Sequence, residues 1–96
     1  MKRRILPRAA RDIAAIEAYI DEVNPEAATG VATRIRRAFD LITDRPDVGR
    51  PTPVPHLREW SVPGLPYVIA YRVRGDMVEI LRAFHASRRR PTSWIG

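Results

Sequence analysis

The chain contains no cysteine, only one lysine and no long hydrophobic run. Without cysteine it can hold neither a disulfide nor a cysteine-ligated zinc ion, and it has no thiol nucleophile. No apolar stretch approaches the roughly 20 residues that a membrane-spanning helix requires. The basic start MKRRILP has an apolar stretch that is too short for a secretory signal. We therefore expect a cytoplasmic protein that does not bind a membrane.

The length of 96 residues leaves room for one hydrophobic core. Chains of this size bury roughly 60–65% of the surface that they expose when unfolded, and two smaller domains would each need disulfides or metals. The hydrophobic content of 45% is typical of a globular chain. We therefore expect residues 1–96 to form a single domain.

Negative charge is scarce in the second half of the chain. Residues 1–49 carry nine cations and eight anions, a balance of +1, whereas residues 50–96 carry eight arginines and three anions, a balance of +5. A high-GC genome would explain why arginine outnumbers lysine, but it would not explain this uneven placement. The asymmetry predicts a polyanionic partner, either a nucleic acid or an acidic protein.

The first half of the sequence predicts two amphipathic helices. In RAARDIAAIEAYIDEV the apolar residues recur at helical spacing and are expected to form one face: Ile13, Ile16, Ile20 and Val23. Asn24 and Pro25 suit the cap and the first position of a second helix, which we expect over about residues 25–45. Gly30 is expected to permit close packing of this helix against the first. The short connection predicts an antiparallel hairpin.

The remaining sequence predicts strands. Residues 2–6 are expected to form an edge strand, and residues 46–55, with four prolines, a stiff loop. Three extended runs follow, at residues 57–62, 65–73 and 77–85.

The last two runs are joined by a tight turn at Gly75–Asp76, which favours antiparallel pairing. The last run is apolar on both faces, as is typical of an interior strand. We expect one face to carry Val78, Ile80 and Phe84, and the other to carry Met77, Leu81 and Ala83.

The order of elements is strand, helix, helix, strand, strand, strand. We therefore predict an α+β fold: a single small domain with a mainly antiparallel sheet and an N-terminal helical hairpin packed on one of its faces. The other face of the sheet is expected to stay partly open.

The stretch ILRAFHASRRRP, residues 80–91, contains the candidate chemical groups. An arginine in a hydrophobic strand must pair or face an open surface, so Arg82 either forms a salt bridge to Glu59 or Glu79 or offers its charge to a phosphate or carboxylate. His85 could act as a general acid or base, or serve only as a hydrogen-bonding residue at the strand end. His56, in the proline loop, is expected to have a structural role. Two histidines without a third ligand at suitable spacing do not predict a metal site.

The arginines of the second half are candidates for binding an anionic target or partner, although charge runs are usually solvated. Aromatic residues beside them could stack on bases, but in strands they more often belong to the core. We expect Trp94 to fold back and pack. The candidate binding residues are Arg58, Arg72, Arg74, Arg82, Arg88, Arg89, Arg90 and Trp94.

In this order of elements, the quoted segments resemble the RelE/ParE superfamily of type II toxin–antitoxin toxins. The resemblance covers nearly the whole chain: AARDIAAIEAYI, NPEAA between the helices, RPDVGRP after them, LREWSV, PYVIAYRV and VEILRAFHASRRRP. It implies the α+β fold and an acidic, partly disordered antitoxin that wraps the toxin. We expect no cofactor. The resemblance also implies one of two activities, because RelE-like members cut mRNA on the ribosome whereas ParE-like members poison DNA gyrase.

The resemblance is closer to the ParE branch. A RelE-like nuclease would use Arg82, His85 and Glu59 for the phosphate, the acid and the base. However, no tyrosine follows residue 71, and the mid-chain lysines of some members are absent. The resemblance therefore implies DNA gyrase as the target, with the ribosome and its mRNA as the alternative.

Overall fold

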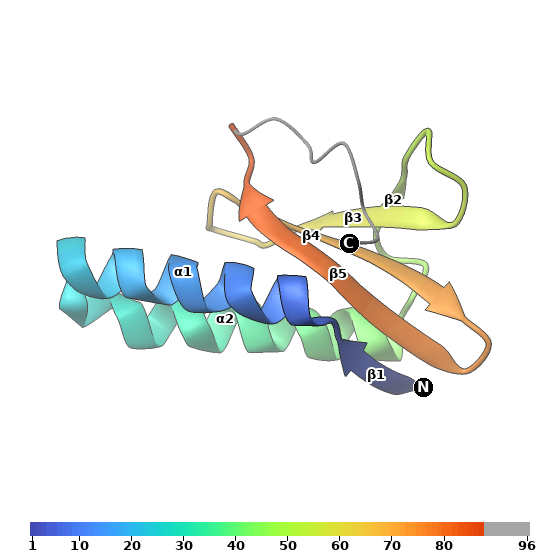
Figure 1. The fold of residues 1–96 in the computed structure, drawn as a ribbon, viewed down its shortest axis with the longest axis horizontal. Helices are drawn as coiled ribbons and strands as arrows, with labels where there is room; N and C mark the ends of the chain where they lie inside the picture. The colour runs from blue at the N-terminus through green and yellow to red at the C-terminus, as the bar shows by residue number, and fades with distance from the viewer. Residues whose placement is uncertain (88–96) are drawn as a thin grey trace.

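The computed structural model describes residues 1–87, and in this range it forms two helices and a five-stranded sheet (Figure 1). The elements are β1 (Lys2–Ile5), α1 (Pro7–Val23), α2 (Pro25–Asp44), β2 (Arg50–Pro51), β3 (Leu57–Ser61), β4 (Tyr67–Arg74) and β5 (Met77–His85). The predicted α+β fold, with a helical hairpin on one face of the sheet, is confirmed. None of the described helices is long and apolar enough to cross a membrane.

The sheet has the strand order β1-β5-β4-β3-β2 and is mainly antiparallel. Only β1 runs parallel to its neighbour, β5, and it lies at the edge of the sheet as predicted. The short strand β2 was not predicted, because it lies inside the proline-rich segment that we expected to be a loop. It pairs with β3 through two residues, and its Pro51 is tolerated because β2 is the other edge strand.

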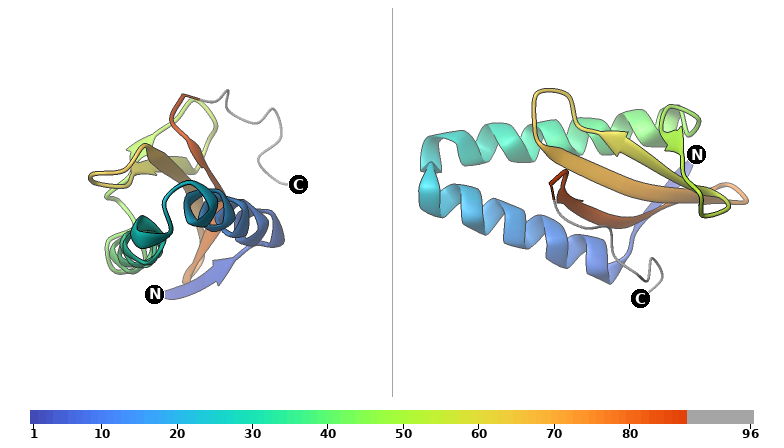
Figure 2. Two further views of the ribbon diagram at one scale, coloured as in Figure 1. Left: turned by 90° about the vertical axis from the view of Figure 1, so that its left-hand side faces the viewer. Right: turned by 90° about the horizontal axis from the view of Figure 1, so that it is seen from above.

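The helical hairpin packs its apolar stripe on one face of the sheet, and its α1–α2 turn projects beyond the sheet (Figure 2). Ile13, Ile16 and Ile20 are half-buried against the core, as predicted. Val23 was assigned to the same face, but it is 58% exposed, because it lies where the hairpin has passed the end of the sheet.

Two details of the hairpin differ from the prediction. Asn24 occupies the cap position of α2, but its side chain makes no capping hydrogen bond. Gly30 does not mediate close packing, because a Cβ atom added there would meet nothing within 4 Å.

A β-bulge changes which residues of β5 share a face. Ala70 of β4 pairs with Arg82, but the next residue, Tyr71, pairs with Ile80, so that Leu81 is the extra residue on β5. Phe84 consequently joins Leu81 in the apolar cluster on the face opposite the helices, whereas Ile80 packs toward the helices. The predicted grouping of Phe84 with Ile80 was therefore wrong.

The predicted turn between the last two strands is confirmed. Gly75 and Asp76 connect β4 to β5, and Gly75 has a φ of +60°. A positive φ at the first central residue is what a tight type II′ hairpin turn requires, and glycine adopts it without a Cβ clash.

Candidate functional site

Arg82 forms an ion pair with α1 rather than with either glutamate that the sequence suggested. Its Nε lies 2.8 Å from Oδ2 of Asp12, and its Nη2 lies 3.3 Å from Oδ1. The same Oδ2 accepts the backbone N–H of Ala83 at 3.0 Å. The pairing of β1 with β5 ends at Ile80, and beyond that point the Asp12 carboxylate accepts the N–H of Ala83.

The two glutamates of the sheet pair with other arginines. Glu59 is buried, and its Oε1 lies 3.0 Å from Nη2 of Arg50. Glu79 is also buried and accepts a 2.6 Å hydrogen bond from Nε of Arg72, with Arg74 at 3.9 Å. These pairs occur across neighbouring strands, where opposite charges stabilise the sheet.

His85 lies at the end of β5 with one ring nitrogen engaged. Its Nδ1 accepts the backbone N–H of Ser87 at 3.1 Å and lies 2.7 Å from the Ser87 hydroxyl. The neutral imidazole therefore carries its proton on Nε2. The ring meets Tyr67 edge to face with 5.7 Å between centroids, and both rings line a cavity of about 530 Å³ that Tyr19 of α1 also lines.

Glu59 does not share a site with Arg82, although the sequence suggested both for a nuclease. Glu59 lies opposite Ala70, and Ala70 lies opposite Arg82, so Glu59 and Arg82 are two strands apart, roughly 10 Å between Cα atoms. Arg82 is paired with Asp12 on α1, and Asp12 lines the same cavity as His85, whereas Glu59 is buried beside Arg50. General acid–base catalysis requires such groups within hydrogen-bond reach of one reacting atom.

The predicted binding arginines are distributed over several places. Arg58 donates to the Gly49 carbonyl at 2.6 Å and reaches the Asp47 carbonyl at 3.5 Å, so it fastens the loop before β2. Arg72 and Arg74 share Glu79, which leaves one positive charge in excess there. The candidates Arg88, Arg89, Arg90 and Trp94 lie outside residues 1–87.

Tyr71 also holds the loop before β2, through two hydrogen bonds. This buried side chain donates its hydroxyl proton to the Pro46 carbonyl at 2.7 Å and accepts the Gly49 N–H at 2.8 Å. Burial raises the pKa of Tyr71 above its ordinary value, and the Gly49 hydrogen bond and the charge of Arg58 oppose this rise only in part. The neutral phenol is therefore the form that the fold stabilises.

The stability of the protein is expected to fall above about pH 10, the ordinary tyrosine pKa. There the phenol ionises in the unfolded chain, while the raised pKa keeps Tyr71 protonated in the folded one. The stabilisation is complete below that pH and is lost as pH rises toward the pKa of folded Tyr71. Urea unfolding across the alkaline range should show this decline, with a shallower slope for Tyr71→Phe. Equal slopes would contradict the assignment.

The connection from β2 to β3 contains a strained residue that sequence reasoning missed. The Leu57 N–H donates to the Val54 carbonyl at 3.2 Å, which closes a turn with Pro55 and His56 in its centre. His56 has a φ of +64°, the only positive φ outside glycine in the described part of the chain. Proline followed by a residue with positive φ is typical of a type II turn, where glycine or asparagine is the usual second residue. Pro55 was therefore an available signal.

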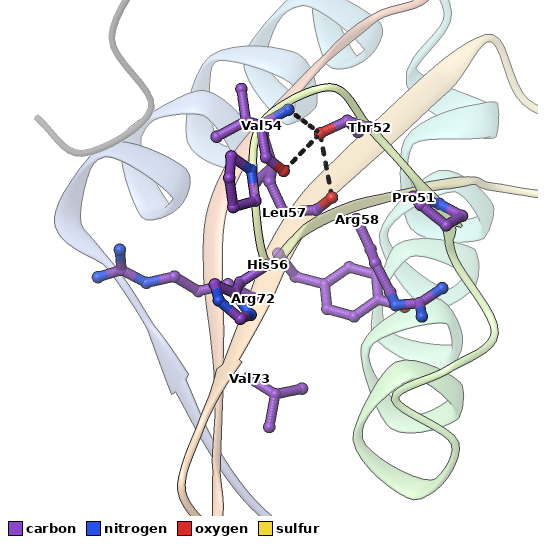
Figure 3. Close-up of a pocket in the computed structure, with 10 residues that line it drawn as sticks. Pro51, Thr52, Val54, His56, Leu57, Arg58, Arg72 and Val73 are labelled. Carbon is purple, nitrogen blue, oxygen red and sulfur yellow. Dashed lines mark hydrogen bonds between the residues drawn. The ribbon is translucent and has the colours of Figure 1, made fainter.

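A cavity of about 300 Å³ lies beside this turn, between it and β4 (Figure 3). Arg58 and Arg72 extend from its two sides, and the ring of His56 lies at its rim. Within residues 1–87, no three histidine, aspartate or glutamate side chains come together as a metal-binding group.

Comparisons with known proteins agree with this fold. A family model described as "ParE toxin of type II toxin-antitoxin system, parDE" matches residues 4–90. A putative toxin Y4kP of Sinorhizobium fredii is 40% identical over 84 residues, which cover 88% of this chain and 86% of the relative. Toxin RelE2 of Caulobacter vibrioides is 41% identical over 81 residues, 84% of this chain and 90% of the relative.

A solved structure has the same fold. The structure titled "Chromosomal ParDE TA system from P. aeruginosa" superposes with a TM-score of 0.79 at 26% identity. The match covers 88% of this chain and 95% of that chain. The resemblance stated from the sequence is therefore confirmed at the level of the superfamily.

Proposed function

The chain belongs to the ParE toxin family of type II toxin–antitoxin systems, and we propose that it stops growth by binding DNA gyrase. Such a toxin would stabilise the state of gyrase in which the DNA is cleaved, and it would act in the cytoplasm. Membership of a type II system implies a cognate antitoxin.

The observation that carries this proposal is the engagement of the groups that a nuclease would require. Arg82 is held by Asp12, Glu59 is buried beside Arg50, and Nδ1 of His85 accepts from Ser87. A protein that acts by binding needs none of these groups to move protons. The geometry therefore favours a toxin that works through its surface rather than through catalysis.

The charge of the chain supports the proposed mode of neutralisation. A net charge of +6, concentrated in the second half, suits an acidic antitoxin that folds as it binds. Attraction between opposite charges would also speed the association of the two proteins.

Expression of the chain without its antitoxin tests the proposal directly. A gyrase poison should produce filamentous cells and a DNA-damage response, and DNA synthesis should fall before protein synthesis does. Parallel labelling of DNA, RNA and protein synthesis measures this order. Prompt loss of protein synthesis with continued DNA replication would overturn the proposal.

A ribosome-dependent ribonuclease is the second candidate, and the position of His85 favours it. The ring lines a cavity with Tyr19 and Tyr67, so a substrate bound in that cavity would lie beside the imidazole. Two curated relatives also bear the name Toxin RelE. In this case mRNA would be cut within codons in the ribosomal A site.

Replacing His85 with alanine separates the two candidates. We expect His85→Ala to reduce toxicity only modestly, because a gyrase poison needs no proton donor there. A nuclease that uses His85 as its acid would lose about 10²–10⁴-fold in cleavage rate. Growth after graded induction, together with cleavage of translated mRNA, measures the difference. Ser87→Ala serves as the control, because it removes a hydroxyl near Nδ1 but leaves the imidazole in place.

A further inference from the structure

The turn between β2 and β3 is unusually well fixed for an exposed connection. Prolines occupy positions 51, 53 and 55, and each restricts its own φ. The Thr52 hydroxyl bonds to the Val54 N–H at 3.2 Å and to the Leu57 carbonyl at 3.1 Å (Figure 3). We call residues 52–57 the proline turn, and these bonds hold it in one shape.

The sequence of the proline turn is not the one that stability alone would select. A residue with φ of +64° in the second central position of a type II turn is normally glycine or asparagine, yet here it is His56. A histidine in this conformation destabilises the folded chain. Backbone strain of this kind is found mostly at sites of function.

The tip of the proline turn also exposes apolar surface. Val54 is 42% exposed, and Pro53, Pro55 and His56 are exposed around it. The connection between β2 and β3 projects away from the helical hairpin (Figure 1). A rigid tip loses little entropy when a partner holds it, so this combination suits recognition.

The cavity beside the tip has a definite charge. His56, Arg58 and Arg72 line it, and none of the described residues that line it is acidic. Arg72 pairs with Glu79, but Arg74 shares the same carboxylate, so the excess charge of this group is positive. The cavity therefore suits a carboxylate that approaches beside an apolar contact to Val54.

We infer that the proline turn is the element with which this toxin docks on its folded protein target. A convex and rigid tip fits a partner that has a preformed pocket on its surface, as a folded protein does. A disordered antitoxin instead folds into grooves of the toxin. The partner site is apolar at its centre, where Val54 inserts, and acidic at the rim that faces His56 and Arg72. Under the proposed function, on which this step rests, the target is DNA gyrase.

Two substitutions test the docking role without disturbing the fold. Val54→Ser removes the apolar contact, and His56→Gly removes the imidazole while it suits the positive φ. Val23→Ser is the matched control for the first, because Val23 is 58% exposed on the projecting end of the hairpin. All three variants should unfold at a temperature close to or above that of the wild type, and all should still bind the antitoxin.

The measurements are growth inhibition and binding to purified gyrase. We expect the dissociation constant to rise about tenfold or more for Val54→Ser and His56→Gly, as for other buried interface contacts, and to stay unchanged for Val23→Ser. Toxicity should fall in parallel.

Full toxicity of both turn variants would overturn the inference, as would a loss of binding to the antitoxin that parallels the loss of toxicity. If wild-type toxin does not bind gyrase, the proposed function fails by itself. The growth assay still reports whether the proline turn contacts the actual target, because its readout does not depend on which target is bound.

Discussion

Replacing Asp12 with alanine is expected to lower the free energy of unfolding by about 2–3 kcal/mol. The carboxylate pairs with Arg82 through two hydrogen bonds and also accepts the Ala83 N–H. The side chains of Arg82 and Asp12 are only 16% and 19% exposed, so water replaces the lost partner poorly. The substitution leaves both a largely buried guanidinium and a strand N–H without their acceptor. Thermal and urea unfolding of purified protein measure the effect.

A second variant on the same helix provides the control. Asp21 is exposed on α1, and Asp21→Ala should change stability by no more than about 0.5 kcal/mol. The double variant Asp12→Ala/Arg82→Ala should be less destabilised than the sum of the single variants, because the two share one interaction. Additive losses, or similar losses for Asp12 and Asp21, would show that the ion pair does not fasten α1 to the sheet.

The elements that the sequence predicted well are those with local signals. These signals depend only on residues that are close together along the chain. They are the helical spacing of apolar residues in 8–23, the helix boundary at Asn24–Pro25 and the glycine of the turn at residue 75. Both helices and the three main strands accordingly lie within one or two residues of their predicted bounds. The order of these elements, together with the resemblance, was sufficient to predict the α+β architecture.

The errors arose where distant segments meet. Asp12 and Arg82 are 70 positions apart, and their contact depends on β1 ending early enough for α1 to run beside β5. Glu59 and Glu79 were the nearer candidates in sequence, but the cross-strand register gives them to other arginines. The bulge at Leu81 places Phe84 on the sheet face opposite Ile80. One extra residue shifts every later side chain of a strand to the other face.

The sequence suggested candidate residues for a site but not the partners that they find in the fold. Composition and resemblance selected Arg82, His85 and Glu59 as residue types that a nuclease uses, yet neither shows which partner each side chain finds. The strain at His56 follows from the closure of residues 54–57 into a turn, and the proline-rich loop was expected without that closure. Long-range pairing and turn closure thus decide what these residues can do.

Alanine at Gly49 and at Gly30 should have opposite effects on stability. A Cβ atom at Gly49 would lie 2.5 Å from the Tyr71 hydroxyl oxygen and 2.7 Å from its Cε1, and that ring is buried. Either the ring or the loop must move, which also breaks the bonds of Tyr71 to Pro46 and Gly49. We expect Gly49→Ala to cost about 3 kcal/mol, or a fall of roughly 15 °C in the thermal midpoint.

Gly30→Ala makes the same chemical change in open space inside α2, where a Cβ atom meets nothing within 4 Å. It should stabilise the protein by about 0.5–1 kcal/mol, because alanine is the better helix former. Scanning calorimetry of the two variants beside wild type gives both values in one experiment. A neutral Gly49→Ala would mean that Tyr71 does not hold the loop. It would also remove the support that fixes the base of the proline turn, since the Tyr71 and Arg58 contacts to residues 46–49 are what join that segment to the sheet.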